Sequence, residues 1–173
     1  MTIKRRGTTS ALKRLAYAQL LILGFSLTHA IQAAPASSLM SGFNPLIGGQ
    51  WVLGSTYQTY TWGPDQQSVF GESFVIHNGE KALGAKGLWY FDPASKTIKG
   101  VFVATNMPFT VLHYRSHFEA GTLISQVRSL DNLGTENHYQ ETIRVTQPDA
   151  YLWELTEAEP AGNTMKAEFH RAP

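Results

Sequence analysis

The sequence predicts an all-β protein, an antiparallel up-and-down (meander) β-barrel of about 8–10 strands. Three observations favour this fold. Short segments rich in β-branched and aromatic residues alternate apolar and polar side chains. Turn signals separate these segments at a spacing of about 10–15 residues, which suits antiparallel neighbours because parallel strands need long crossovers. No long helical pattern interrupts the series. Closing so large a sheet removes its exposed edges, and a two-sheet β-sandwich is the alternative.

The first 33 residues predict a secretory signal peptide. They contain five Lys or Arg and no acidic residue, an apolar run of 13 residues from Leu15 to Leu27, and small residues around Ala33. These are the three parts of a signal peptide, and the apolar run is shorter than the roughly 20 residues that span a bilayer. We therefore expect cleavage after Ala33, with Ala30 as an alternative. The mature protein is expected to be periplasmic or secreted, with no membrane span.

The remaining chain predicts one domain of mildly acidic character. Residues 34–42 are small and polar and predict a linker, and residues 43–173 predict a single β-barrel domain. Without the five positive charges of the leader, the net charge changes from +1 to −4. A domain of this charge without a Lys/Arg cluster is unsuited to nucleic acid, so no such partner is expected. The absence of cysteine excludes disulfides and thiolate chemistry.

The expected elements follow one another with turn signals between them. A short helical turn at residues 43–47 ends at Gly48-Gly49, and a strand at 51–57 is then extended or repeated at 59–62. Asn78-Gly79 predicts a two-residue hairpin, and Asp92-Pro93 stops the aromatic strand at 82–91. The other expected strands are residues 68–77, 97–105, 109–118, 122–130, 136–146, 151–156 and 164–170.

Alternation along the C-terminal strands gathers apolar and aromatic side chains on one face. The simpler interpretation is a packed interior and a solvated polar face. The alternative is that this many strands enclose more space than their side chains fill, which leaves a cavity for an apolar ligand. The residues predicted to contact such a ligand are Tyr114, Tyr139, Trp153 and Phe169 on the inner face, and Tyr90 of the central strand.

Three tryptophans have a different expected role. Trp51, Trp62 and Trp89 lie at or near strand ends and beside glycines. In small barrels such residues usually plug the floor or support the N-terminal segment. We expect this role for them in preference to lining the mouth of a ligand site.

No pattern of residues predicts a catalytic or metal site. His113 and His117 are four residues apart. In a strand this spacing corresponds to about 13 Å, whereas one zinc ion needs each nitrogen at about 2 Å. A solvated polar face explains the pair. The sequence contains no Gly-x-Ser-x-Gly elbow, Gly-rich phosphate loop or His-Glu-x-x-His motif. No catalytic residue, metal ligand or cofactor is predicted, and a haem or metal site built on one histidine stays open as an alternative.

The order of several aromatic motifs resembles a known family. Gly49-Gln50-Trp51 resembles the Gly-x-Trp opening of lipocalin-like (calycin-type) barrels. Further motifs follow at Thr59-Tyr60-Thr61-Trp62-Gly63, Gly87-Leu88-Trp89-Tyr90-Phe91-Asp92-Pro93 and Tyr151-Leu152-Trp153-Glu154. The chain from 43 to 171 is thus similar to the secreted bacterial lipocalin-like domains of uncharacterised function. Lipocalins usually add a C-terminal helix and often a disulfide, and neither is predicted for this chain.

The resemblance implies a periplasmic or secreted binding module for a small apolar or amphipathic molecule. Two hypotheses from other classes stand beside it. One is an enzyme, a hydrolase or isomerase, that uses a His and a carboxylate in the barrel cavity; pairs such as His138 with Glu141 are available in the sequence. The other is a structural or protein-interaction domain with a filled barrel. A binding protein is favoured over an enzyme, and no oligomeric state is predicted.

Overall fold

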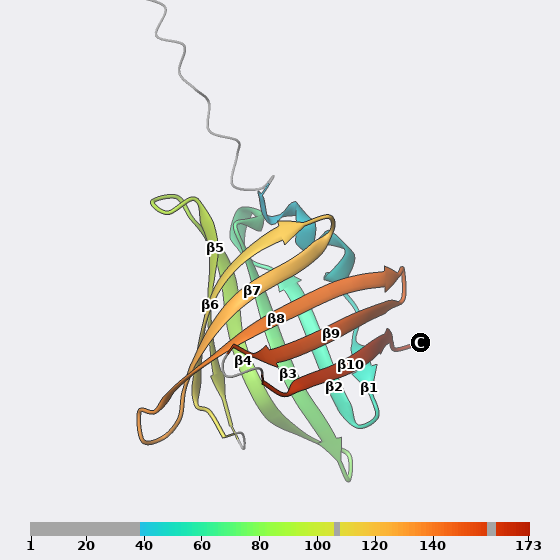
Figure 1. Ribbon diagram of the computed structural model, residues 1–173. Helices are drawn as coiled ribbons and strands as arrows, with labels where there is room; N and C mark the ends of the chain where they lie inside the picture. Colours follow the sequence, from blue (N-terminus) through green and yellow to red (C-terminus); the bar gives the residue numbers. More distant parts are fainter. Residues whose placement is uncertain (1–38, 106–107, 159–161) are drawn as a thin grey trace, which may run out of the picture. The chain divides into compact units, whose positions relative to one another are not determined.

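The computed structural model describes residues 39–105, 108–158 and 162–173, so the predicted signal peptide lies outside the described residues. These residues form ten antiparallel strands in one closed meander barrel (Figure 1), in which β1 pairs with β10. The predicted fold class is confirmed. The strands are β1 (Trp51–Leu53), β2 (Thr56–Trp62), β3 (Ser68–His77), β4 (Glu80–Asp92), β5 (Thr97–Ala104), β6 (Val111–Glu119), β7 (Thr122–Leu130), β8 (Glu136–Gln147), β9 (Ala150–Glu157) and β10 (Thr164–Arg171). Two 3-10 helices are η1 (Ser41–Leu46) and η2 (Pro64–Gln66).

The main difference from the predicted elements lies at the start of the barrel. The sequence suggests a strand over residues 51–57, whereas the chain turns at Gly54 and Ser55 and divides this region into β1 and β2. Gly54 has a φ of +59°, a conformation that glycine adopts at little steric cost. The turn lets Leu53 pair with Thr56. As a result β1 is only three residues long and serves to join β2 to β10.

The predicted hairpin at Asn78-Gly79 joins β3 and β4. Both residues have positive φ, 51° and 82°, as the favoured two-residue hairpin turn requires. Farther along the pair, the register shifts, because Ser73 pairs with Ala85 and Phe74 pairs with Leu83. Gly84 is therefore an extra residue in β4, and a bulge of this kind bends the strand.

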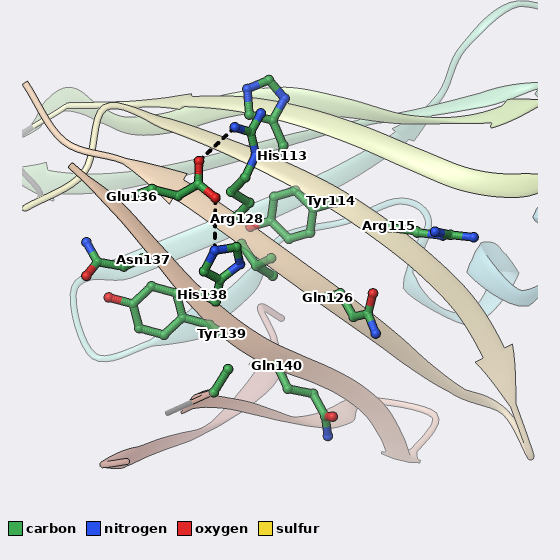
Figure 2. A pocket seen from close by; sticks show the side chains of 12 residues that line it. His113, Tyr114, Arg115, Gln126, Arg128, Glu136, Asn137, His138, Tyr139 and Gln140 are labelled. Carbon is green, nitrogen blue, oxygen red and sulfur yellow. Dashed lines mark hydrogen bonds and ion pairs between the residues drawn. The ribbon is translucent and has the colours of Figure 1, made fainter. Parts of the chain in front are cut away.

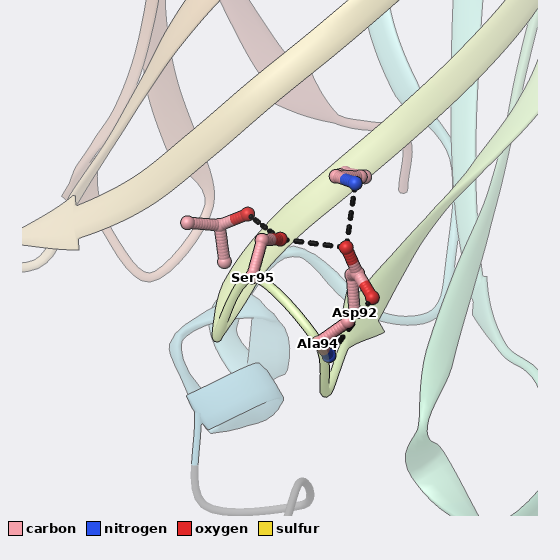
Figure 3. Close-up of polar contacts among 5 residues, drawn as sticks. Asp92, Ala94 and Ser95 are labelled. Carbon is pink, nitrogen blue, oxygen red and sulfur yellow. Dashed lines mark hydrogen bonds and ion pairs between the residues drawn. The ribbon is translucent and has the colours of Figure 1, made fainter.

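The Asp92 side chain holds the turn that ends β4 (Figure 3). Its carboxylate accepts hydrogen bonds from the Ala94 backbone N–H at 3.1 Å and from Ser95 Oγ at 2.6 Å, and it pairs with Lys99 Nζ at 2.5 Å. Lys99, and then Ser95, hold the pKa of Asp92 well below its usual range, since both contacts favour the charged carboxylate. The predicted stop at Asp92-Pro93 is thus a structured turn.

The short helix η1 closes one end of the barrel (Figure 1). Phe43 and Leu46 of η1 are buried, and Met40 is buried just before it, within the segment predicted as a linker. The Phe43 ring contacts Phe118 edge-on with centroids 5.0 Å apart, and it lies 5.5 Å from Trp89. The expected helical turn is therefore confirmed, and Trp89 belongs to the floor that this turn covers. Within the described ranges, no helix is long and apolar enough to cross a membrane.

Trp51 and Arg171 join this floor to the closure of the barrel. The two residues are register partners in β1 and β10, and the Arg171 guanidinium lies 4.2 Å from the Trp51 ring. Trp51 Nε1 donates to the Leu46 carbonyl at 2.9 Å. Arg171 donates to the carbonyls of Gly48 at 2.6 Å and Pro45 at 2.8 Å. One pair of side chains therefore fixes both the last strand pairing and the end of η1 with the residues that follow it.

Replacing Arg171 with alanine should lower the free energy of unfolding by about 2–4 kcal/mol, because its charge-assisted hydrogen bonds, above all those to Gly48 and Pro45, and a cation–π contact are lost. Arg171→Lys should recover only part of this loss, since a lysine ammonium cannot present the planar fork of donors. Urea denaturation of the purified variants measures both effects.

Arg128→Ala is the matched control. Arg128 pairs with Glu136 at 3.0 Å on the surface, with both side chains more than 40% exposed. Such a pair contributes about 0–1 kcal/mol. Equal losses in Arg171→Ala and Arg128→Ala would show that Arg171 does not hold the barrel closed.

Candidate functional site

A cavity of about 400 Å³ lies inside the barrel. Its wall is mostly apolar and draws on β2 to β6 and β8 to β10. Trp89, which packs against η1, borders the inner end, and Met165, at the start of β10 and 53% exposed, borders the other end. The cavity therefore opens away from η1. Six aromatic side chains line it, namely Tyr60, Trp89, Phe102, Phe109, Tyr114 and Trp153.

Inward-facing glycines make room for the aromatic wall. Gly71 and Gly87 are register partners in β3 and β4, and a Cβ atom at Gly87 would lie 2.5 Å from the Phe102 ring. In β5, a Cβ atom at Gly100 would lie 2.8 Å from Cδ1 of Trp89. Contacts this short do not occur between side chains, so the rings of Trp89 and Phe102 occupy space that only glycine leaves free.

Glu141 brings an ionisable group into this wall. It belongs to β8, lines the cavity and is only 6% exposed. Its Oε1 accepts a hydrogen bond from Trp153 Nε1 at 2.8 Å, whereas its buried Oε2 has no hydrogen-bonding partner among the residues that the structure describes. Burial raises the pKa of Glu141 to about 7, and the bond from Trp153 offsets part of that rise. The carboxyl group is thus oriented through one oxygen and unpaired at the other.

The neighbouring tyrosines, in contrast, are hydrogen-bonded to each other and to Gln58. Tyr60 and Tyr151 both donate to the Gln58 side-chain oxygen, at 2.6 and 2.5 Å, and their hydroxyls lie 3.3 Å apart. Burial raises the pKa values of Tyr60, Tyr114 and Tyr151. The negative charge of Glu141 raises all three further, so these hydroxyls stay neutral.

The structure brings two of the five predicted ligand-contact residues to the cavity. Tyr114 and Trp153 line it. Phe169 is buried in the wall, where its ring stacks on Tyr151 with centroids 5.0 Å apart. Tyr139 packs against the core and borders a second concavity. Tyr90 lies on the outer face, 39% exposed, because its neighbour Trp89 takes the inner one. A role in ligand contact therefore stays a prediction for Tyr114 and Trp153.

The second concavity lies along β6, β7 and β8 and is polar (Figure 2). Its outer-face side chains include His113, Arg128 and His138, which are register partners across the three strands. Glu136 pairs with Arg128 at 3.0 Å and with His138 at 2.9 Å. All three of these paired side chains are more than 40% exposed, so water and salt screen their interactions. The apolar cavity inside the barrel is the better candidate site.

The described lining of the cavity does not contain the His–carboxylate pair that the enzyme hypothesis needs. None of the five histidines in the described residues lines it. His138 meets a carboxylate on the outer face, but the partner is Glu136, whereas Glu141 faces inward. His113 and His117 both belong to the strand β6, as the sequence predicts. Across the described ranges, no group of three His, Asp or Glu side chains comes together in a way that could hold a metal ion.

Sequence reasoning named Glu141 only as a possible acid–base partner of His138 and missed its burial in the cavity wall, although a signal was present. Residues 139, 141, 143 and 145 share one face of a strand, and three of them are Tyr139, Ile143 and Val145. An acidic residue within an apolar face points to a buried carboxyl group. The hydrogen bond from Trp153 had no such signal, because it depends on the register in which Ile143 pairs with Trp153.

A ten-strand antiparallel meander barrel is compatible with a lipocalin-like fold. No model of a known protein family matches the chain. No curated protein matches it either.

Glu141→Gln should remove a pH dependence of stability. The carboxyl group ionises at a pKa of about 7 in the fold, against an ordinary value of 4.5. Between these values the unfolded chain binds fewer protons, so the free energy of unfolding falls as the pH rises, and above about 7 the fall stops. The whole fall amounts to about 3 kcal/mol for Glu141. In urea denaturation, the free energy of unfolding of the glutamine variant relative to that of the original protein should rise by this amount between about pH 4 and 8.

Glu154→Gln is the control, since Glu154 makes an exposed ion pair with Lys166 at 2.9 Å. Its difference from the original protein should change little over the same pH interval. If the difference for Glu141→Gln were equally constant, the carboxyl group would titrate at its ordinary pKa.

Proposed function

We propose that the protein is a lipocalin-like binding module, periplasmic or secreted, that holds a small apolar or amphipathic molecule inside its barrel. The observation that carries the proposal is the cavity of about 400 Å³ with its aromatic wall. Ligand sites are concave, mostly apolar and have a few polar groups. The cavity combines these properties with one open end, which gives a small molecule a route of entry.

The volume of the cavity favours binding over a purely structural role. Protein interiors are close-packed, and voids larger than a water molecule are few. An unfilled space also costs stability, because the atoms that line it lose contacts. A barrel that served only as a scaffold would gain by filling this space, for example with a larger residue at Ala85, which lines it.

Two further features support the lipocalin-like assignment within this proposal. Trp51 of the Gly49-Gln50-Trp51 opening packs at the closed end and donates a hydrogen bond to Leu46, the last residue of η1. At the opposite end the cavity is bordered by the exposed Met165, where a ligand could enter. The periplasmic or extracellular location rests on the signal peptide that the sequence predicts.

Ala85→Phe should block binding of an apolar ligand. The added ring would occupy the cavity, so the fluorescent probe N-phenylnaphthylamine should bind at least about tenfold more weakly than to the original protein, a difference of about 1.4 kcal/mol. Fluorescence titration measures the affinity and the stoichiometry.

Val103→Phe is the matched control. Val103 lies on the neighbouring strand β5 beside the register partner of Ala85, and it is 54% exposed on the outer face. The variant should bind the probe as the original protein does.

Mass spectrometry of protein purified from its native compartment gives a second test. Repeated absence of any bound molecule, together with equal probe binding by both phenylalanine variants, would exclude the cavity as a ligand site.

A further inference from the structure

We propose that the cavity selects apolar molecules that carry a protonated amine, and that the ammonium group binds to Oε2 of Glu141. The inference rests on the proposed binding function and names the class of ligand. Among the described residues of the cavity wall, Glu141 has a buried carboxylate oxygen without a hydrogen-bonding partner.

Glu141 needs a hydrogen-bond donor that the described part of the chain does not provide. Trp153 Nε1 already bonds to Oε1 at 2.8 Å, and this contact fixes the orientation of the carboxyl group. An ionised carboxylate only accepts hydrogen bonds, and leaving a buried acceptor unpaired is costly. The nearby hydroxyls of Tyr60 and Tyr151 donate to Gln58 instead. A ligand that donates to Oε2 therefore satisfies the group that the fold leaves unsatisfied.

The charge around Glu141 favours a cation over a neutral donor. Among the described residues that line the cavity, there is no Lys, Arg or His. The other acidic residue in this described lining is Glu72, whose carboxylate pairs with Lys81 at 2.9 Å and with Lys86 at 2.7 Å. The tyrosines that face Glu141, Tyr60, Tyr114 and Tyr151, are neutral. Once ionised, Glu141 is thus a buried negative charge without a positive partner, and a ligand cation is the group that compensates it.

The aromatic wall adds to the same preference. Trp89, Tyr114 and Trp153 line the cavity together with Glu141. The faces of aromatic rings attract a desolvated ammonium group, tryptophan most strongly. They offer no comparable stabilisation to an anion. An apolar carboxylate, such as a fatty acid, would in addition place a second negative charge beside Glu141, so the cavity should discriminate against it.

The selectivity should depend on pH. Binding of an ammonium group requires ionised Glu141, whereas burial keeps the carboxyl group protonated up to about pH 7 in the free protein. Alkyl amines stay protonated throughout this range. Their affinity should therefore fall by up to about tenfold for each pH unit below 7, and the affinity of an uncharged alcohol should not follow this change.

The test compares decylamine, decanol and decanoate as competitors for bound N-phenylnaphthylamine at about pH 8, where Glu141 is ionised. The three share one apolar chain and differ in their head group. Decylamine should bind at least about tenfold more tightly than decanol, as expected for a buried charge-assisted contact, and decanoate should bind least. Glu141→Gln should bring decylamine to within about twofold of decanol. Glu154→Gln, the same change in an outer-face ion pair, should keep the full preference.

Each outcome separates the two proposals. Tight probe binding with equal affinities for amine, alcohol and carboxylate would overturn the amine selectivity and leave the binding function standing. A preference that Glu154→Gln abolishes as strongly as Glu141→Gln would overturn it too, because it would arise from the overall charge. Absence of binding by the probe and by all three competitors would exclude the binding function itself. Urea denaturation of each variant at the same pH confirms that the compared proteins are folded.

Discussion

The contact between Trp51 and Arg171 is the constraint on which the barrel depends. β1 is three residues long and reaches β10 through two register pairs, one of which is Trp51 with Arg171. So short a ladder provides little pairing of its own, and without it β2 and β10 would each expose an unpaired edge. The Arg171 side chain compensates by donating to the carbonyls of Pro45 in η1 and Gly48 after it, and by covering the Trp51 ring. The same two side chains therefore hold the β1–β10 pairing that closes the sheet and the η1 segment that covers the end of the barrel.

This closure also determines the properties of the cavity. Because η1 covers one end, Phe43 and Trp89 form an apolar floor and a ligand can enter only from the opposite end. Glu141 lines the cavity above this floor, and its burial in the wall raises the pKa of the carboxyl group.

The sequence predicts the fold well because the decisive signals are local. Asn78-Gly79 specifies its hairpin through two positive φ angles, and alternation in β6 to β10 separates the inner face from the outer one. The division of the first strand at Gly54 was ambiguous, since the residues on both sides of Gly54 have the pattern of a β-strand.

The candidate site is less predictable from the sequence than the fold. Tyr90 was expected among the ligand contacts, yet it lies on the outer face beside the inward-facing Trp89. Whether side chains fill the interior depends on how they pack in three dimensions. The Phe102 ring, for example, fits only because Gly87 has no side chain.

Glu141 is costly at neutral pH, because its ionised form is buried without a positive partner. A hydrophobic residue of similar volume would avoid this cost. Groups that lower stability are typical of functional sites, where activity and stability compete. Trp153 strengthens this interpretation, since its hydrogen bond holds the carboxyl group in one orientation without neutralising it. A carboxylate that is oriented by the protein but not paired by it is organised in advance for a group that arrives from outside, and such organisation lowers the cost of binding.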